Sequence, residues 1–232
     1  WESIRIDTGA VANLSYSSIT YTLKGLHYFF AQSGEVSNCL ISEFGVNEDF
    51  RGGFGMGGWA IRGFTLEEGI TVSNCVIANG YNFCPGILIR HSGDLVVRDC
   101  VIRNLDNKGI NVSHQHEPDW NIDISGCEIS ESHGGIYLNT NTTRLINVRD
   151  CRIIDCNYGI LVSGLCSILI ENNDIHDHEE YGIRIAYRYE IENQAIIKNN
   201  RIFNCEEGIR IGDEGNVRDE DGLFLDIQFN TI

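Results

Sequence analysis

Apolar and polar residues alternate in short segments that recur along the chain. In one segment Leu95 and Val97 stand two positions apart, and in the next Ile122 and Ile124 repeat the arrangement. Alternation of this period is typical of a β-strand with one buried face. The pattern therefore predicts many short strands, and 25 glycines against two prolines predict tight turns between them.

Each alternating segment leads into the same motif. Three residues after its last apolar position comes a Cys, Asn or Ser, which we call the ladder position, and two residues later an isoleucine. The ladder positions are Ser17, Cys39, Cys75, Cys100, Cys127, Cys151, Asn173, Asn200 and Asn230. The isoleucines are Ile19, Ile41, Ile77, Ile102, Ile129, Ile153, Ile175, Ile202 and Ile232. A second strand follows each turn and begins with a glycine, as at Gly109, with Gly58 and Trp59 as the corresponding pair in the second repeat.

The spacing of the ladder positions predicts the architecture. Cys39 follows Ser17 by 22 residues and Cys75 follows Cys39 by 36, which are the extremes of the series. These intervals are too short for helical crossovers between parallel strands, so the chain must coil directly into a solenoid. Nine ladder positions predict about nine rungs. At about 4.8 Å per rung the rod is on the order of 40 Å long.

This repeat resembles the right-handed parallel β-helix repeat family within the pectate-lyase-like superfamily. The resemblance covers nearly the whole chain and implies an all-β fold, a right-handed parallel β-helix built as a single-stranded solenoid. It implies much less about function, because that superfamily contains polysaccharide lyases, glycoside hydrolases, epimerases, phage tailspikes and non-catalytic surface proteins. The sequence lacks the Asn-Thr-Asp and Gly-His-Gly motifs of the polygalacturonase-like hydrolases and the Asp-Pro-His-Asp motif of alginate epimerases.

Length and charge limit the domain organisation and the kinds of partner that we expect. With 232 residues, 42% of them hydrophobic, residues 1–232 can form one β-helix domain, interrupted by a Gly-rich inserted loop at about 44–58. The formal net charge of −16 disfavours nucleic acid and favours protein, carbohydrate or cation as the partner. No apolar run approaches the roughly 18 to 20 residues that span a bilayer, so we expect no transmembrane segment.

Cysteine placement predicts thiols rather than a disulfide framework. Five of the nine cysteines occupy ladder positions, where neighbouring parallel rungs give poor disulfide geometry. The disulfide state of the other four is left open by the sequence; they are Cys84, Cys156, Cys166 and Cys205. So many free thiols favour an anaerobic or reducing setting, although an odd number also permits an intermolecular bridge.

Candidate binding residues lie on the glycine-started strands. Residues two and four places after each glycine face outward, and in the superfamily such columns form the groove that binds sugar chains. We expect two basic spots there, Arg62 with Arg90 and Arg184 with Arg210, that could each hold a carboxylate. The predicted substrate-binding residues are Arg62, Arg90, Asn111, Asn139, Arg184 and Arg210.

Between the two basic spots lies the stretch that most resembles an active site. His114 and His116, opposite Tyr137, could supply the base for β-elimination on a uronic acid. The same histidines with Glu117 or Asp119 could instead bind a metal, but two histidines fall short of a zinc site, so we expect no metal and no other cofactor. The competing interpretation is that this stretch is a solvent-exposed turn with no catalytic or binding role.

The ends of the predicted rod suggest association. The sequence shows no amphipathic capping helix at either end, and uncapped terminal rungs pair with other strands. Either the chain is a fragment whose caps lie in flanking sequence, or each molecule covers the next in a homo-oligomer or polymer. The sequence thus favours an extracellular or cell-surface structural protein that self-associates end to end. The alternative is a carbohydrate-active enzyme or binder, a polysaccharide lyase or glycoside hydrolase, acting on acidic polysaccharide.

Overall fold

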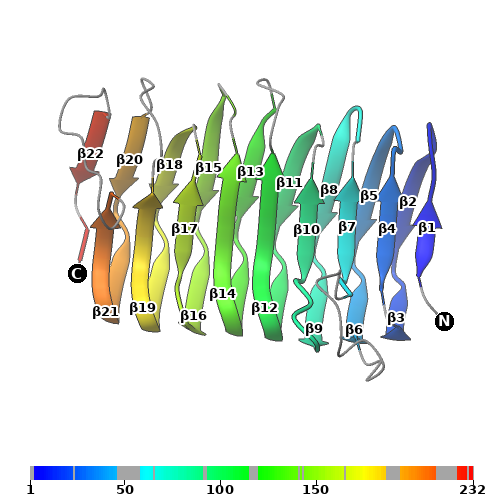
Figure 1. Cartoon of the computed structure of the whole chain (residues 1–232), viewed down its shortest axis with the longest axis horizontal. Coiled ribbons are helices and arrows are strands. Elements are labelled where there is room, and N and C mark those ends of the chain that lie inside the picture. The colour runs from blue at the N-terminus through cyan, green and yellow to red at the C-terminus, as the bar shows by residue number, and fades with distance from the viewer. Residues whose placement is uncertain are drawn as a thin grey trace.

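The chain folds into an all-β parallel solenoid (Figure 1). The computed structural model describes residues 3–22, 24–45, 58–64, 66–90, 93–114, 120–140, 142, 144–164, 166–186, 194–212, 224–228 and 230–231. These residues contain no helix, and hence none that is long and apolar enough to cross a membrane. The predicted all-β parallel solenoid is therefore confirmed. Residues 46–57, most of the predicted Gly-rich insertion, lie outside the described part.

One side of the solenoid is a nine-stranded parallel sheet in which spatial order follows chain order. Its strands are β2 (Val11–Ser15), β5 (Ser33–Ser37), β8 (Gly69–Ser73), β11 (Asp94–Arg98), β13 (Ile122–Ser125), β15 (Leu145–Arg149), β18 (Ser167–Glu171), β20 (Gln194–Lys198) and β22 (Phe224–Gln228). Each strand pairs with the strand one turn away, which is the topology expected when a chain coils directly.

A thirteen-stranded sheet forms the other two sides. The ladder face follows the ladder positions and contains β3 (Ser18–Thr22), β6 (Leu40–Phe44), β9 (Val76–Gly80) and β16 (Arg152–Cys156). The glycine face contains β1 (Ile4–Ile6), β4 (Leu26–Phe29), β7 (Ile61–Phe64), β10 (Ile87–Arg90) and β17 (Ile160–Ser163). Four long strands run round the corner through both faces: β12 (Val101–His114), β14 (Glu128–Thr140), β19 (Asp174–Ala186) and β21 (Arg201–Ile211).

The number of rungs is smaller than predicted. Nine ladder positions suggested about nine rungs, but the chain makes about seven turns. The difference arises at the ends, where rungs are not paired on both sides. Among the described strands β2 pairs with β5 alone and β3 with β6 alone. At the other end Thr231 adds only an isolated bridge to Arg201.

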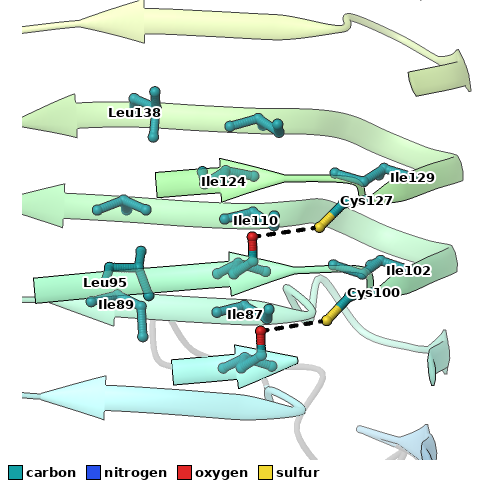
Figure 2. Packing of buried hydrophobic residues seen from close by; sticks show 14 of the residues in the cluster. Ile87, Ile89, Leu95, Cys100, Ile102, Ile110, Ile124, Cys127, Ile129 and Leu138 are labelled. Atoms are coloured by element: carbon teal, nitrogen blue, oxygen red, sulfur yellow. Dashed lines mark hydrogen bonds between the residues drawn. The ribbon is translucent and has the colours of Figure 1, made fainter. Parts of the chain in front are cut away.

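The core is built from stacked identical side chains. The ladder isoleucines from Ile41 to Ile202 are fully buried, and Cys100 and Cys127 are each 1% exposed. Each of these thiols points at a carbonyl of the preceding rung, with Sγ 3.7 Å from Val72 O for Cys100 and 3.8 Å from Val97 O for Cys127 (Figure 2). The nine cysteines, all in the described part of the chain, form no disulfide bond with one another, and the five on the ladder are buried, as predicted.

Asparagine replaces cysteine in the last part of the ladder and adds stronger hydrogen bonds. The Asn173 Oδ1 accepts a hydrogen bond from the Cys151 backbone N at 2.9 Å, while its Nδ2 donates to Val148 O at 3.1 Å. Asn200 repeats the arrangement and accepts from the Asn173 backbone N at 3.0 Å. Because Asn173 is 2% exposed, its amide satisfies backbone groups that water does not reach.

Two turns of each rung use left-handed backbone conformations. The residue before the ladder position has a φ of 51° at Asn74 and 53° at Asp99, and the residue four places after the ladder position has 58° at Asn79 and 52° at Asp155. Asn and Asp tolerate this region better than other residues with a side chain. These turns make the chain change face at the same point of every rung.

Candidate functional site

The candidate site is the outward surface of the glycine face, where β4, β7, β10, β12 and β14 lie side by side (Figure 1). Between buried residues such as Ile87 and Ile89, alternate side chains point away from the core. The first outward column, in register, is Arg5, His27, Arg62, Leu88, Asn111, Tyr137, Leu161, Arg184 and Arg210. The second is Phe29, Phe64, Arg90, Ser113, Asn139, Ser163 and Ala186.

The position of Arg62 differs from the prediction. The sequence placed it in the same column as Arg90 because Gly58 was taken as the start of its strand. In the structure Ala60 occupies the glycine position: Leu26 N donates to Ala60 O at 2.8 Å, and Ile61 N donates to Gly86 O at 2.9 Å. Arg62 therefore lies in the first column beside His27 and Leu88.

Cations and aromatic rings interleave at the amino-terminal end of this face. The Arg62 guanidinium carbon lies 4.5 Å from the Trp59 ring centroid and 5.3 Å from that of Phe64. The Lys24 Nζ lies 5.4 Å from the same indole ring, and the Arg5 guanidinium lies 4.6 Å from the Phe29 ring. Contacts of this kind hold a cation in place without neutralising its charge.

The rings also pack on one another. Phe29 and Phe64 stack at 5.5 Å between centroids, and Phe29 meets Phe30 edge-on at 4.6 Å. His27 contacts Trp59 edge-on at 5.2 Å. We call this group the cation–aromatic cluster; its members are Arg5, Lys24, His27, Phe29, Phe30, Trp59, Arg62, Phe64 and Arg90.

The cluster brings several cations together, and one of them, Arg5, pairs with Asp7 at 2.7 Å between Nε and Oδ1. Burial, followed by the charges of Arg62, Arg5 and Lys24, lowers the pKa of His27 to about 4, so its ring is neutral at pH 7. Burial and the nearby charge of Arg90 lower the pKa of Arg62, which as a guanidinium stays protonated. Although Arg62 and Arg90 occupy different columns, their charges lie close enough to interact.

At the centre of the face lie the tyrosine and asparagines predicted from the sequence. Tyr137 follows Asn111 in the first column and Asn139 follows Ser113 in the second. The Tyr137 hydroxyl lies 3.5 Å from the Ser163 Oγ, and the Lys108 Nζ lies 5.4 Å from the centroid of the Tyr137 ring. The centre therefore combines a phenol, amides, hydroxyls and one ammonium group.

The predicted histidines are not placed by the structure. His114 ends β12, and its side chain lies outside the description, as do residues 115–119 with His116. Among the described residues no group of three or more His, Cys, Asp or Glu side chains is arranged to hold a metal.

The other two arginines predicted to form a basic spot lie at the carboxyl-terminal end of the glycine face. Arg184 and Arg210 lie directly opposite each other in neighbouring strands. The Arg184 guanidinium lies 5.5 Å from the Tyr181 ring centroid, and the Arg210 Nη1 lies 3.1 Å from the Glu207 Oε1.

Cations on the other two sides of the solenoid pair with carboxylates. Arg149 lies 3.2 Å from Asp123, and Lys198 lies 3.1 Å from Glu171. On the ladder face Arg152 lies 3.7 Å from Glu128. Carboxylates also pair with cations of the glycine face, since Arg5 lies 2.7 Å from Asp7 and Arg210 lies 3.1 Å from Glu207. Aromatic rings lie against Arg5, Arg62 and Arg184 there as well.

Sequence reasoning missed Trp59, Lys108 and Tyr158. Each stands immediately before a corner residue, Ala60, Gly109 or Gly159, at positions that the column assignment treated as turns. A signal was available, because Lys24, Lys108, Tyr158 and Tyr181 all precede a glycine that begins a strand.

A separate pocket of about 510 Å³ lies where the ladder strands turn toward the glycine face. It is lined by Phe83, Leu105, Asp106, Glu131, Ser132, His133, Asp155 and Asn157. Three of these eight residues carry carboxylates and none is a lysine or arginine, so the pocket differs in charge from the glycine face.

Comparison with known proteins supports the architecture. A search of curated proteins and a search of solved structures found no match. The family model described as the right handed beta helix region matches residues 2–143 and again residues 85–224. Since these matches together span most of the 232 residues, the chain belongs to the right-handed β-helix family.

Proposed function

We propose that the glycine face binds an acidic polysaccharide laid along the rod. The observation that supports this most directly is the cation–aromatic cluster, in which the Arg62 guanidinium lies over the Trp59 ring on a chain of net charge −16. Aromatic rings offer a flat apolar surface, and guanidinium groups bind carboxylates with two parallel hydrogen bonds. A sugar chain that carries carboxylates presents both partners.

The length of the face supports an extended ligand. Neighbouring strands lie about 4.8 Å apart, and cationic side chains occur in the first column at Arg62 and again, five strands further along, at Arg184. Asn111 and Asn139 lie between these cations and can hydrogen-bond to sugar hydroxyls. A small ligand would use one of these sites, whereas a polymer would use several.

Binding is tested by calorimetry with polygalacturonate and alginate at low and high ionic strength, and with a carboxyl-reduced polymer. Affinity should fall with added salt and disappear for the reduced polymer. Arg62→Gln should weaken binding about tenfold through loss of a charge-assisted contact, and Trp59→Ala should weaken it similarly. Arg152→Gln, on the ladder face, is the matched control. If the wild-type protein binds none of the acidic polymers, the proposal is wrong.

Cleavage is a separate question from binding. A uronate lyase generates unsaturated products that absorb in the ultraviolet, and Tyr137 is then the described residue best placed to act, with Lys108 against its ring. Product formation by the wild type and its loss in Tyr137→Phe, with binding retained, would make the protein an enzyme. Binding without product would leave a non-catalytic carbohydrate-binding protein.

End-to-end association is the second candidate function. Among the described strands the outer edges of β2 and β3 lack a neighbour, and Ile4, Val11 and Ile227 are 38%, 57% and 45% exposed. Strand edges of this kind pair with further strands, from a second copy or from flanking sequence. An extracellular or cell-surface location would suit either function.

Sedimentation across a range of concentrations tests this candidate. Ile4→Lys or Ile227→Lys should lower the association constant, because a charge would be desolvated at the contact. Glu68→Lys, an exposed change away from the ends, serves as the control. A wild-type protein that stays monomeric at high micromolar concentration would exclude self-association.

A further inference from the structure

The residues immediately before the corner residues form an edge row along the glycine face. Backbone hydrogen bonds define it: Gly25 N donates to Trp59 O at 2.7 Å, Gly86 N to Lys108 O at 3.1 Å, and Gly135 N to Tyr158 O at 2.9 Å. The row contains Lys24, Trp59, Pro85, Lys108, Gly134, Tyr158, Tyr181 and Glu207. Gly134 is the only member without a side chain, and it lies between Lys108 and Tyr158.

The Tyr158 ring covers Gly134. A Cβ at position 134 would lie 2.4 Å from Tyr158 Cζ and 2.6 Å from its hydroxyl oxygen, closer than any side chain allows. Lys108 is directly opposite Gly134 in the neighbouring strand. The absent side chain therefore lets the Tyr158 phenol reach across its neighbouring rung toward the rung of Lys108.

The Lys108 side chain lies on the other side of Gly134 from Tyr158. Its Nζ lies 5.4 Å from the Tyr137 ring centroid, and Tyr137 belongs to the same strand as Gly134. Lys108 is partly buried, and this burial lowers the pKa of its ammonium group. An anion at this point would interact with the ammonium more strongly than at an exposed lysine.

Two buried polar atoms on this part of the glycine face, one on Tyr158 and one on Asn111, have no hydrogen-bond partner. Tyr158 is 6% exposed, its ring stacks on Tyr181 at 5.4 Å, and its hydroxyl makes no hydrogen bond. The Asn111 Oδ1 is likewise buried and unpaired. Buried polar groups are nearly always paired, and leaving one unpaired costs about 1–3 kcal/mol. The phenolic donor and the ammonium donor thus come from the two rungs on either side of Gly134, and the amide acceptor lies on the rung of Lys108.

We infer that Lys108 and Tyr158 together hold one anionic oxygen group of the ligand, a carboxylate or a sulfate, beside Gly134, while Asn111 accepts a hydrogen bond from a sugar hydroxyl. This deepens the proposed function of the glycine face and rests on it. It adds a central anion subsite between the cation–aromatic cluster and the Arg184–Arg210 pair. The subsite sets where along the rod a charged sugar is held.

Two variants test the subsite by calorimetry with polygalacturonate and with dextran sulfate. Lys108→Met keeps the length of the side chain and removes its charge, and Tyr158→Phe keeps the ring and removes the donor. Each should weaken binding about tenfold, the loss expected for a charge-assisted hydrogen bond. The matched controls are Lys198→Met, whose ammonium pairs with Glu171 on another side, and Tyr16→Phe, which is 85% exposed. If the affinity for polygalacturonate depends on Lys108, the group held is a carboxylate. If the affinity for dextran sulfate depends on it, the group held is a sulfate.

Acetylation of Lys108, followed by mass spectrometry, supplies a readout that does not depend on folding of a variant. Bound polymer should protect Lys108 severalfold while leaving Lys198 unprotected. Wild-type binding that Arg62→Gln weakens but Lys108→Met and Tyr158→Phe do not, with Lys108 acetylated equally in the presence of polymer, would overturn the subsite and leave the proposed function standing. No binding by the wild type would overturn both.

Discussion

At the ladder position, the choice between cysteine and asparagine decides how neighbouring rungs are joined. Cys127 fills space and points Sγ at a carbonyl 3.8 Å away, a weak interaction. Asn173 instead bonds two neighbouring backbone groups, at 2.9 Å and 3.1 Å. The same site in the coil thus accepts either a small apolar group or an amide that matches the backbone.

Exchanging these residues tests their roles. Asn173→Ala should lower the free energy of unfolding by about 1–3 kcal/mol for each backbone group left unpaired. Cys151→Asn should be neutral or stabilising. The Ile124 carbonyl oxygen lies 3.9 Å from the Cys151 Sγ, and the amide of an asparagine at this position could donate a hydrogen bond to it. Urea denaturation measures both. A loss in Cys151→Asn as large as that in Asn173→Ala would show that the two halves of the ladder are not equivalent in space.

Accessibility of individual thiols is a second test at this scale. Cys127 is 1% exposed and Cys166 is fully buried, and burial raises the pKa of Cys166 to about 12. Alkylation requires the thiolate, so both should react only as fast as the fold opens. Cys205, which is partly buried, should react first. Rapid labelling of Cys127 in the native protein would contradict the ladder assignment.

At the scale of a strand, the isoleucine two places after the ladder position is the principal packing element. Ile129 is fully buried and lies opposite Ile102 and Ile153 in the neighbouring strands. Ile129→Ala should therefore cost about 2–5 kcal/mol through lost burial and the cavity left behind. Glu128→Ala, the exposed neighbour on the same strand, should change the stability by less than about 0.5 kcal/mol. Thermal and chemical unfolding of the pair measure the difference.

The strands also show what the sequence could and could not predict. The alternation of apolar and polar residues predicted both the buried columns and the ladder, because every second residue of a half-buried strand must be apolar. The start of β7 was misplaced, because Gly58 looked like the corner glycine whereas Ala60 fills that position. Contacts such as those of Lys108 with Tyr137 join different rungs through side-chain direction, which alternation does not encode. The same holds for the Tyr158 ring over Gly134.

At the scale of the whole molecule, stability should depend on pH through a buried histidine. His178 is 4% exposed, and burial lowers its pKa to about 4. Unfolded histidine has a pKa of about 6.5, so between these values the unfolded chain binds a proton that the folded chain does not. This contribution is fully present above pH 6.5 and is lost as the pH falls toward 4.

The free energy of unfolding, measured by urea denaturation at several pH values, checks this. Between pH 6.5 and 4 the free energy of unfolding of His178→Gln should decrease less steeply than that of the wild type. The difference in slope should correspond to at most one proton taken up on unfolding. His133→Gln, a histidine that hydrogen-bonds Asn157 near the surface, is the control. Identical pH profiles for the wild type and His178→Gln would contradict the assignment.

The change from thiols to amides along the ladder has a consequence for temperature. Apolar burial weakens on cooling, whereas the hydrogen bonds of Asn173 and Asn200 depend on it much less. Each rung of a solenoid contacts only its neighbours, so the two ends can respond differently. The cysteine-lined rungs should therefore loosen first in the cold, and the asparagine-lined rungs should keep their register longest.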